Sequence, residues 1–63
     1  MKLTIYWKTK DKECIERIRE LFSLPPYMTI NGETQADIKD EDMEILKETA
    51  SKGFIEIRHK HVL

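Results

Sequence analysis

The side chain with the most reactive chemistry in this 63-residue chain is the thiol of Cys14, its single cysteine. One thiol forms no internal disulfide, and it acts as a nucleophile only where its surroundings favour the thiolate. Cys14 falls near the start of a predicted helix, where the helix dipole favours that form, but also on the apolar stripe of the same helix. We predict a structural role in the core and keep a redox role as the alternative.

Two other groups of side chains have the chemistry of metal ligands. His59 and His61 form a His-x-His pair near the end of the chain, but two imidazoles without further ligands make a weak site. A mid-chain acidic cluster lacks the glycine that a calcium loop needs at its sixth position. The cluster consists of Asp37, Asp40, Glu41, Asp42 and Glu44. We assign it to helix capping and a solvated helix face, and we expect no metal, no cofactor and no catalytic residues.

Composition argues against several classes of function. Eleven basic and twelve acidic side chains leave a net charge of −1. Because a nucleic-acid binder that neutralises phosphates needs a basic face, nucleic acid is not the expected partner. The chain contains no apolar run of the roughly 18 residues that a membrane span needs. A lone thiol fits a reducing compartment, so we expect a soluble, cytoplasmic protein without a membrane partner.

Hydrophobic periodicity predicts the elements that position these groups. Residues 3–7 alternate as a strand, with Leu3, Ile5 and Trp7 on one face. Asp11 is a predicted N-cap, and apolar residues at helical spacing follow as far as Ser23. The dipeptide Asn31-Gly32 predicts a type I′ hairpin between strands 27–30 and 33–38. A second helix begins at an Asp40 cap and closes at Gly53, and residues 54–58 form a last strand.

This order of elements predicts an α+β, ferredoxin-like two-layer sandwich. Both helices lie on one face of a four-stranded antiparallel sheet, with the first and third strands in its centre. We expect a single domain over residues 1–63, in which residues 59–63 form a flexible tail. The other face of the sheet is expected to be open and polar. It carries Thr4, Tyr6, Thr29, Gln35, Asp37, Glu56 and Arg58.

Two segments resemble glutaredoxins. Residues 4–14, Thr-Ile-Tyr-Trp-Lys-Thr-Lys-Asp-Lys-Glu-Cys, are similar to the first strand and active-site loop of that family. Asp11 stands where the nucleophilic cysteine would be, and Cys14 where the resolving cysteine would be. Pro26 and residues 30–33, Ile-Asn-Gly-Glu, resemble the cis-proline strand and hairpin of the family. The resemblance implies a truncated thioredoxin-like fold and a degenerate, redox-inactive glutaredoxin-like protein, and we keep both as alternatives.

The segment 23–27, Ser-Leu-Pro-Pro-Tyr, is the apolar stretch best suited to contact a partner. Its two prolines lower the entropy lost on ordering. The leading hypothesis is therefore a non-enzymatic protein-interaction or regulatory module whose partner is another protein or, as a homodimer, a second copy. A third hypothesis is weak nucleic-acid binding through the open sheet face. The predicted interaction surface consists of Tyr6, Leu24, Pro25, Pro26, Tyr27 and Thr29.

Overall fold

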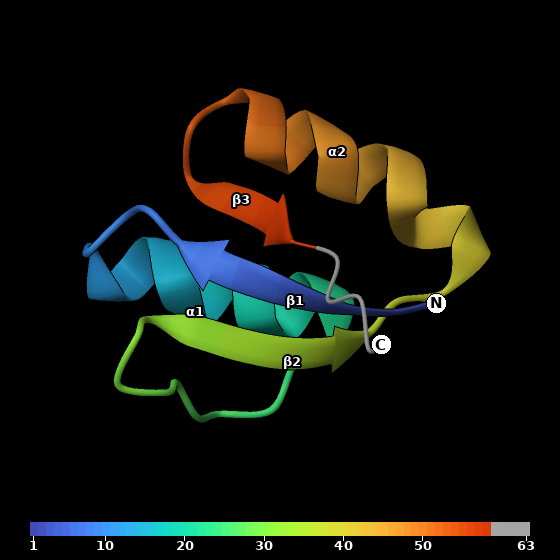
Figure 1. The fold of residues 1–63 in the computed structure, drawn as a ribbon. Helices are drawn as coiled ribbons and strands as arrows, with labels where there is room; N and C mark the ends of the chain where they lie inside the picture. The colour runs from blue at the N-terminus through green and yellow to red at the C-terminus, as the bar shows by residue number, and fades with distance from the viewer. Residues whose placement is uncertain (59–63) are drawn as a thin grey trace.

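The structure, a computed structural model, describes residues 1–58. The His59–His61 pair and the predicted tail lie outside the described residues. The elements follow one another as β1 (Lys2–Trp7), α1 (Lys12–Phe22), β2 (Glu33–Asp37), the 3-10 helix η1 (Asp40–Asp42), α2 (Met43–Ser51) and β3 (Ile55–Arg58). The strands form one sheet, with α1 behind it and α2 alongside β3 (Figure 1).

The sheet has three strands in the order β2-β1-β3, and β1 pairs antiparallel with both neighbours. Ile5 of β1 faces Thr34 of β2 on one side and Ile57 of β3 on the other. The α+β class is correct, but the four-stranded ferredoxin-like sandwich is wrong, because residues 27–30 form no strand. β1 lies in the centre of the sheet as expected, but β2, which was expected to be central as well, is an edge strand.

Proline shortens the segment that was available for a second strand. Pro25 and Pro26 have no N–H to donate to a sheet ladder, so only a short segment remains before the turn. Among the described residues, one backbone bond joins that segment to β2, from the Thr29 N–H to the Glu33 carbonyl at 2.8 Å. Residues 25–29 therefore run beside β2 without extending the sheet.

The turn at Asn31-Gly32 also differs from the prediction. The Gly32 N–H donates to the Thr29 carbonyl at 2.9 Å, so Ile30 and Asn31 are the central residues of the turn. Gly32 has a φ of 78°, whereas Asn31 is not in the positive-φ region. This pattern fits a three-residue hairpin loop with glycine in the left-handed position, and it rules out type I′. A Cβ at Gly32 would lie 3.5 Å from the Tyr6 ring.

The core lies on one face of the sheet. Leu3, Ile5 and Trp7 alternate inward along β1, and both helices contribute to the same apolar cluster, so α1 and α2 share this face. The buried cluster consists of Leu3, Ile5, Trp7, Ile18, Phe22, Leu24, Ala36, Ile38, Leu46 and Ile55.

The helix caps are partly as predicted. The Asp11 carboxylate accepts the Glu13 N–H at 3.1 Å and caps α1. Gly53, with a φ of 87°, follows α2 in the left-handed conformation, as expected. The Asp40 cap was wrong, because Asp40 is the first residue of η1 and α2 begins only at Met43. The three residues of η1 are all acidic, and no side-chain hydrogen bond caps this turn.

The end of α1 fixes how the chain leaves the core. Ser23 has φ 53° and ψ 45°, the left-handed conformation, and Leu24 donates its N–H to the Arg19 carbonyl at 2.8 Å. With the weaker bond from Ser23 to Glu20 at 3.4 Å, this is a Schellman motif. Its usual apolar contact is present, because Leu24 is buried in the core cluster.

The left-handed Ser23 generates a first prediction. A non-glycine residue in this conformation is strained, and glycine relieves the strain at some cost in unfolded-state entropy. We expect Ser23→Gly to raise the free energy of unfolding by up to about 1 kcal/mol in a urea titration. Ser51→Gly, at a helical position, is the control and is expected to lower it. A lower stability for Ser23→Gly would show that the serine conformation is not strained.

Candidate functional site

The predicted interaction surface divides into three environments. Tyr6 is half-buried on the sheet face opposite the core, which is only partly open because Thr4 on the same face is 2% exposed. Leu24 is only 8% exposed within the core. Leu24 was therefore misplaced: it anchors the segment and presents little surface to a partner. Pro25, Pro26, Tyr27 and Thr29 are exposed, as expected.

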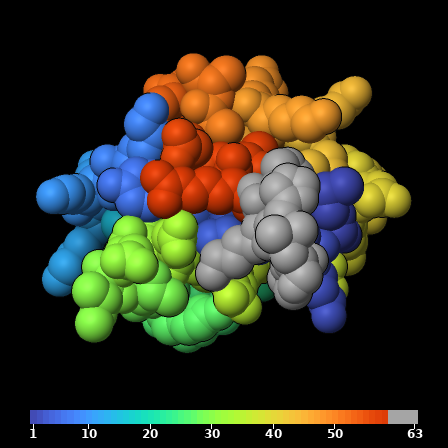
Figure 2. Space-filling view, viewed as in Figure 1, coloured from blue at the N-terminus to red at the C-terminus, as the bar shows by residue number. Residues whose placement is uncertain are grey.

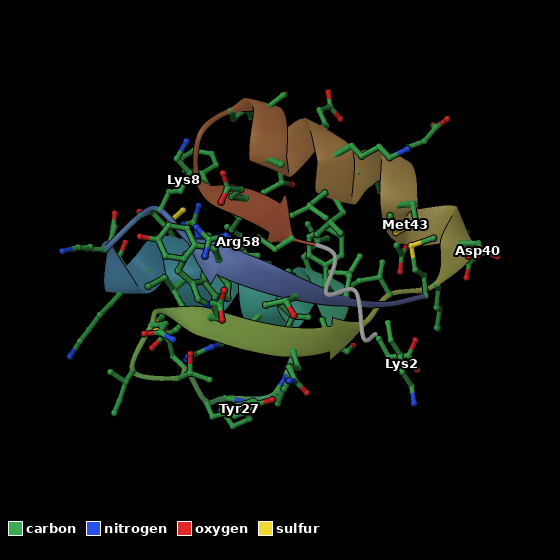
Figure 3. The ribbon with its side chains drawn as sticks, in the orientation of Figure 1. Lys2, Lys8, Tyr27, Asp40, Met43 and Arg58 are labelled. Atoms are coloured by element: carbon green, nitrogen blue, oxygen red, sulfur yellow. The ribbon has the colours of Figure 1, made fainter. Side chains whose placement is uncertain are left out.

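An exposed loop without charge is the most distinctive surface of the molecule. The ten residues 23–32 carry no charged side chain, although charged residues make up 37% of the chain. Residues 25–30 are all exposed, and we call them the uncharged loop. Tyr27 is 44% exposed, Met28 41% and Ile30 fully. The loop lies along the lower rim of the molecule in Figure 2, and Figure 3 places Tyr27 on the outer side of β2.

A buried chain of hydrogen bonds holds the middle of this loop. The Trp7 Nε1–H donates to Thr34 Oγ1 at 2.7 Å, and the Thr34 hydroxyl donates to the Tyr27 carbonyl at 2.7 Å. Trp7 is 4% exposed and Thr34 is fully buried. A buried indole N–H left without an acceptor costs about 1–3 kcal/mol, so this relay ties β1, β2 and the loop together.

The two ends of the loop are anchored as well. Leu24 packs in the core at one end. At the other end, the Thr29 carbonyl accepts a hydrogen bond from the Gly32 N–H. The Thr29 hydroxyl accepts another from the Glu33 N–H at 3.1 Å. The loop is therefore an apolar surface with three points of attachment.

An ion cluster occupies the open face of the sheet. Arg58 lies over the Tyr6 ring, with 4.1 Å from its guanidinium carbon to the ring centroid. The same guanidinium donates to Glu56 at 2.7 Å and to Glu33 at 3.0 Å. These hydrogen bonds, the one to Glu56 first, raise the pKa of Arg58. Figure 3 shows Arg58 in front of the sheet. Its position over the Tyr6 ring covers one face of that ring.

This arrangement bears on the nucleic-acid hypothesis. Bases would need an uncovered ring on which to stack and cations for their phosphates. Tyr6 is covered on one face by Arg58, and Arg58 is engaged by two carboxylates. Asp37 lies on the same face, opposite Lys2 in the β1–β2 register. The described face therefore carries both signs of charge and no basic stripe.

A binding assay tests that electrostatic argument. Fluorescence anisotropy of a labelled single-stranded oligonucleotide at physiological salt is expected to show no binding tighter than about 10⁻⁴ M. The charge-reversed variant Glu33→Lys is the comparison, because it adds positive charge to the same face. Micromolar binding by the unaltered protein, weakening as salt rises, would contradict the argument.

Cys14 sits beside a shallow cleft of about 340 Å³ between the start of α1 and the end of α2. The side chain is half-buried and packs against the core. Arg17, Lys52 and Phe54 line the same cleft. Asp11, which stands at the nucleophile position of the glutaredoxin resemblance, is a helix cap here. The structural role of Cys14 stays a prediction.

A second cleft of about 520 Å³ lies at the β1–β2 side of the sheet, where Tyr27, Gln35 and Asp37 contribute to its lining. The buried polar side chains of residues 1–58 are Thr4 and Thr34, so neither cleft contains a buried titratable group within the described chain. Across the same residues, no group of three or more His, Cys, Asp or Glu side chains is placed to hold a metal ion. No described helix has the length and apolar character to cross a membrane.

Comparisons of the chain with protein-family models, curated proteins and solved structures found no match. The sequence analysis did not identify Met28 and Ile30 as surface residues, because in the predicted strand they alternate with Tyr27 and Thr29 and so fall on its other face. The signal that could have found them is the uncharged run 23–32, which stands out in a highly charged chain.

Proposed function

We propose that this chain is a small, non-enzymatic protein-interaction module that contacts its partner through the uncharged loop. The observation that carries the proposal is the combination of exposure, apolar character and anchoring in residues 25–30. Aromatic residues and methionine are enriched at protein interfaces, whereas lysine and glutamate are depleted there. Tyr27 and Met28 fit that composition, and the loop carries no charge that binding would have to desolvate.

The anchoring supports recognition by a preformed surface. A loop that is ordered before binding loses less conformational entropy when its partner arrives. The Thr34 hydroxyl holds the Tyr27 carbonyl, and the Thr29 turn holds the other end. The two prolines restrict the segment between Leu24 and Tyr27 further.

The small surface area of the loop indicates a weak contact with the partner. Six consecutive exposed residues offer a few hundred square ångströms, about the size of a functional surface patch. This is below the roughly 800 Å² per partner of a standard stable interface, so the proposal is a transient or regulatory contact. A soluble, cytoplasmic protein without cofactor belongs to the same proposal, since a lone thiol fits a reducing compartment.

Site-specific photocrosslinking in the cell of origin tests the proposal. A photoreactive amino acid in place of Met28 is expected to give discrete adducts, because Met28 lies in the middle of the proposed contact. The same amino acid in place of Lys47, which is exposed on α2, is the matched control and is expected to give none of them. Identical adducts at both positions, or no adduct at position 28, would contradict the proposal.

A further inference from the structure

The backbone N–H and C=O of Met28 are unpaired within residues 1–58. Its neighbour Thr29 bonds to the hairpin with both backbone groups, and the Tyr27 carbonyl bonds to Thr34 of β2. Successive residues of an extended chain direct their N–H and C=O groups to opposite sides. On this alternation the N–H and C=O of Met28 would point away from β2. Within residues 1–58 neither group has a hydrogen-bond partner, and Met28 is 41% exposed.

We propose that the partner of the uncharged loop is a second copy of this chain, joined antiparallel about a two-fold axis at Met28. This inference rests on the proposed function and names its partner. At the axis, each Met28 N–H donates to the Met28 carbonyl of the other copy, which makes a hydrogen-bonded pair. In this register Tyr27 faces Thr29 of the other copy, and Pro26 faces Ile30. Because Pro26 has no N–H, the ladder ends there.

Charge favours this segment for contact between identical copies. A two-fold contact places a surface patch against itself, so any charge on the patch faces a like charge or must find an opposite one. Antiparallel pairing of two β2 edges about Gln35 would place Glu33 opposite Asp37 of the other copy, which is destabilising. Pairing about Met28 opposes only uncharged residues.

The size of the molecule favours association as well. A core of this size rarely supplies more than about 3–5 kcal/mol without a disulfide, a metal or oligomerisation. The single cysteine forms no internal disulfide, and binding between folded copies stabilises them by mass action. The limited area of the loop sets the strength, and we expect a Kd between about 1 µM and 1 mM.

Charge reversal at the axis tests the geometry directly. Sedimentation equilibrium of the unaltered protein is expected to show a concentration-dependent dimer. Met28→Lys and Met28→Glu should each weaken it at least tenfold, because like charges then face each other across the axis. An equimolar mixture of the two variants should associate again, since lysine now faces glutamate. Ile45→Lys, at an exposed apolar position on α2, is the matched control and should dimerise normally.

Each contrary outcome has a definite meaning. A protein that stays monomeric at millimolar concentration overturns the two-fold contact, and the crosslinking at position 28 then decides separately whether the loop binds another protein. Dimers that survive both Met28 substitutions place the contact on another surface. Variants that are monomeric alone and do not associate when mixed contradict the facing of the two Met28 side chains. Circular dichroism of each variant checks that it remains folded.

Discussion

The hydrogen-bond relay from the Trp7 indole through the Thr34 hydroxyl to the Tyr27 carbonyl is the interaction on which the candidate site depends. Trp7 is the largest side chain of the core, and its buried N–H needs an acceptor. The Thr34 hydroxyl supplies that acceptor from the facing strand, and it donates its own hydrogen bond to the Tyr27 carbonyl of the loop. The guanidinium carbon of Arg19 in α1 lies over the Trp7 ring, 5.9 Å from its centroid. The same tryptophan therefore also interacts with the helix layer.

The relay explains how a segment without regular structure becomes a defined surface. Residues 27–29 do not join the sheet, and the prolines at positions 25 and 26 cannot donate to it, so the segment has few ladder bonds. A buried side chain supplies the missing attachment at Tyr27, while Leu24 and the Thr29 turn fix the two ends. The outcome is an exposed apolar loop on a chain whose other surfaces are highly charged.

Much of the fold was predictable, because it follows from local patterns. The alternation of Leu3, Ile5 and Trp7 identified β1 and its inward face, and the spacing around Ile18 identified α1. The strand predicted over residues 27–30 failed because β-branched and aromatic composition does not show whether the backbone finds partners. The turn type failed for a related reason: Asn-Gly permits several loops, and the register of Thr29 with Glu33 selected one of them.

The candidate site was predictable only in part. The prolines and Tyr27 were identified from composition, but the burial of Leu24 depends on the Schellman motif that a left-handed Ser23 creates. The role of Thr34 could not be seen either, since a threonine among inward-facing apolar residues gives no sign of its donor or its acceptor. The first feature is a local backbone conformation that a serine does not reveal by its type, and the second depends on Trp7 and Thr34, which are 27 residues apart.

Backbone ¹⁵N relaxation of the free protein tests most directly whether the relay holds the uncharged loop in place. Order parameters for the Met28 and Ile30 amides are predicted to lie near the value of about 0.85 that rigid backbone shows, close to those of α1. Values below about 0.6 at these positions, with α1 and the sheet rigid, would show that the loop is not preformed and would contradict the account.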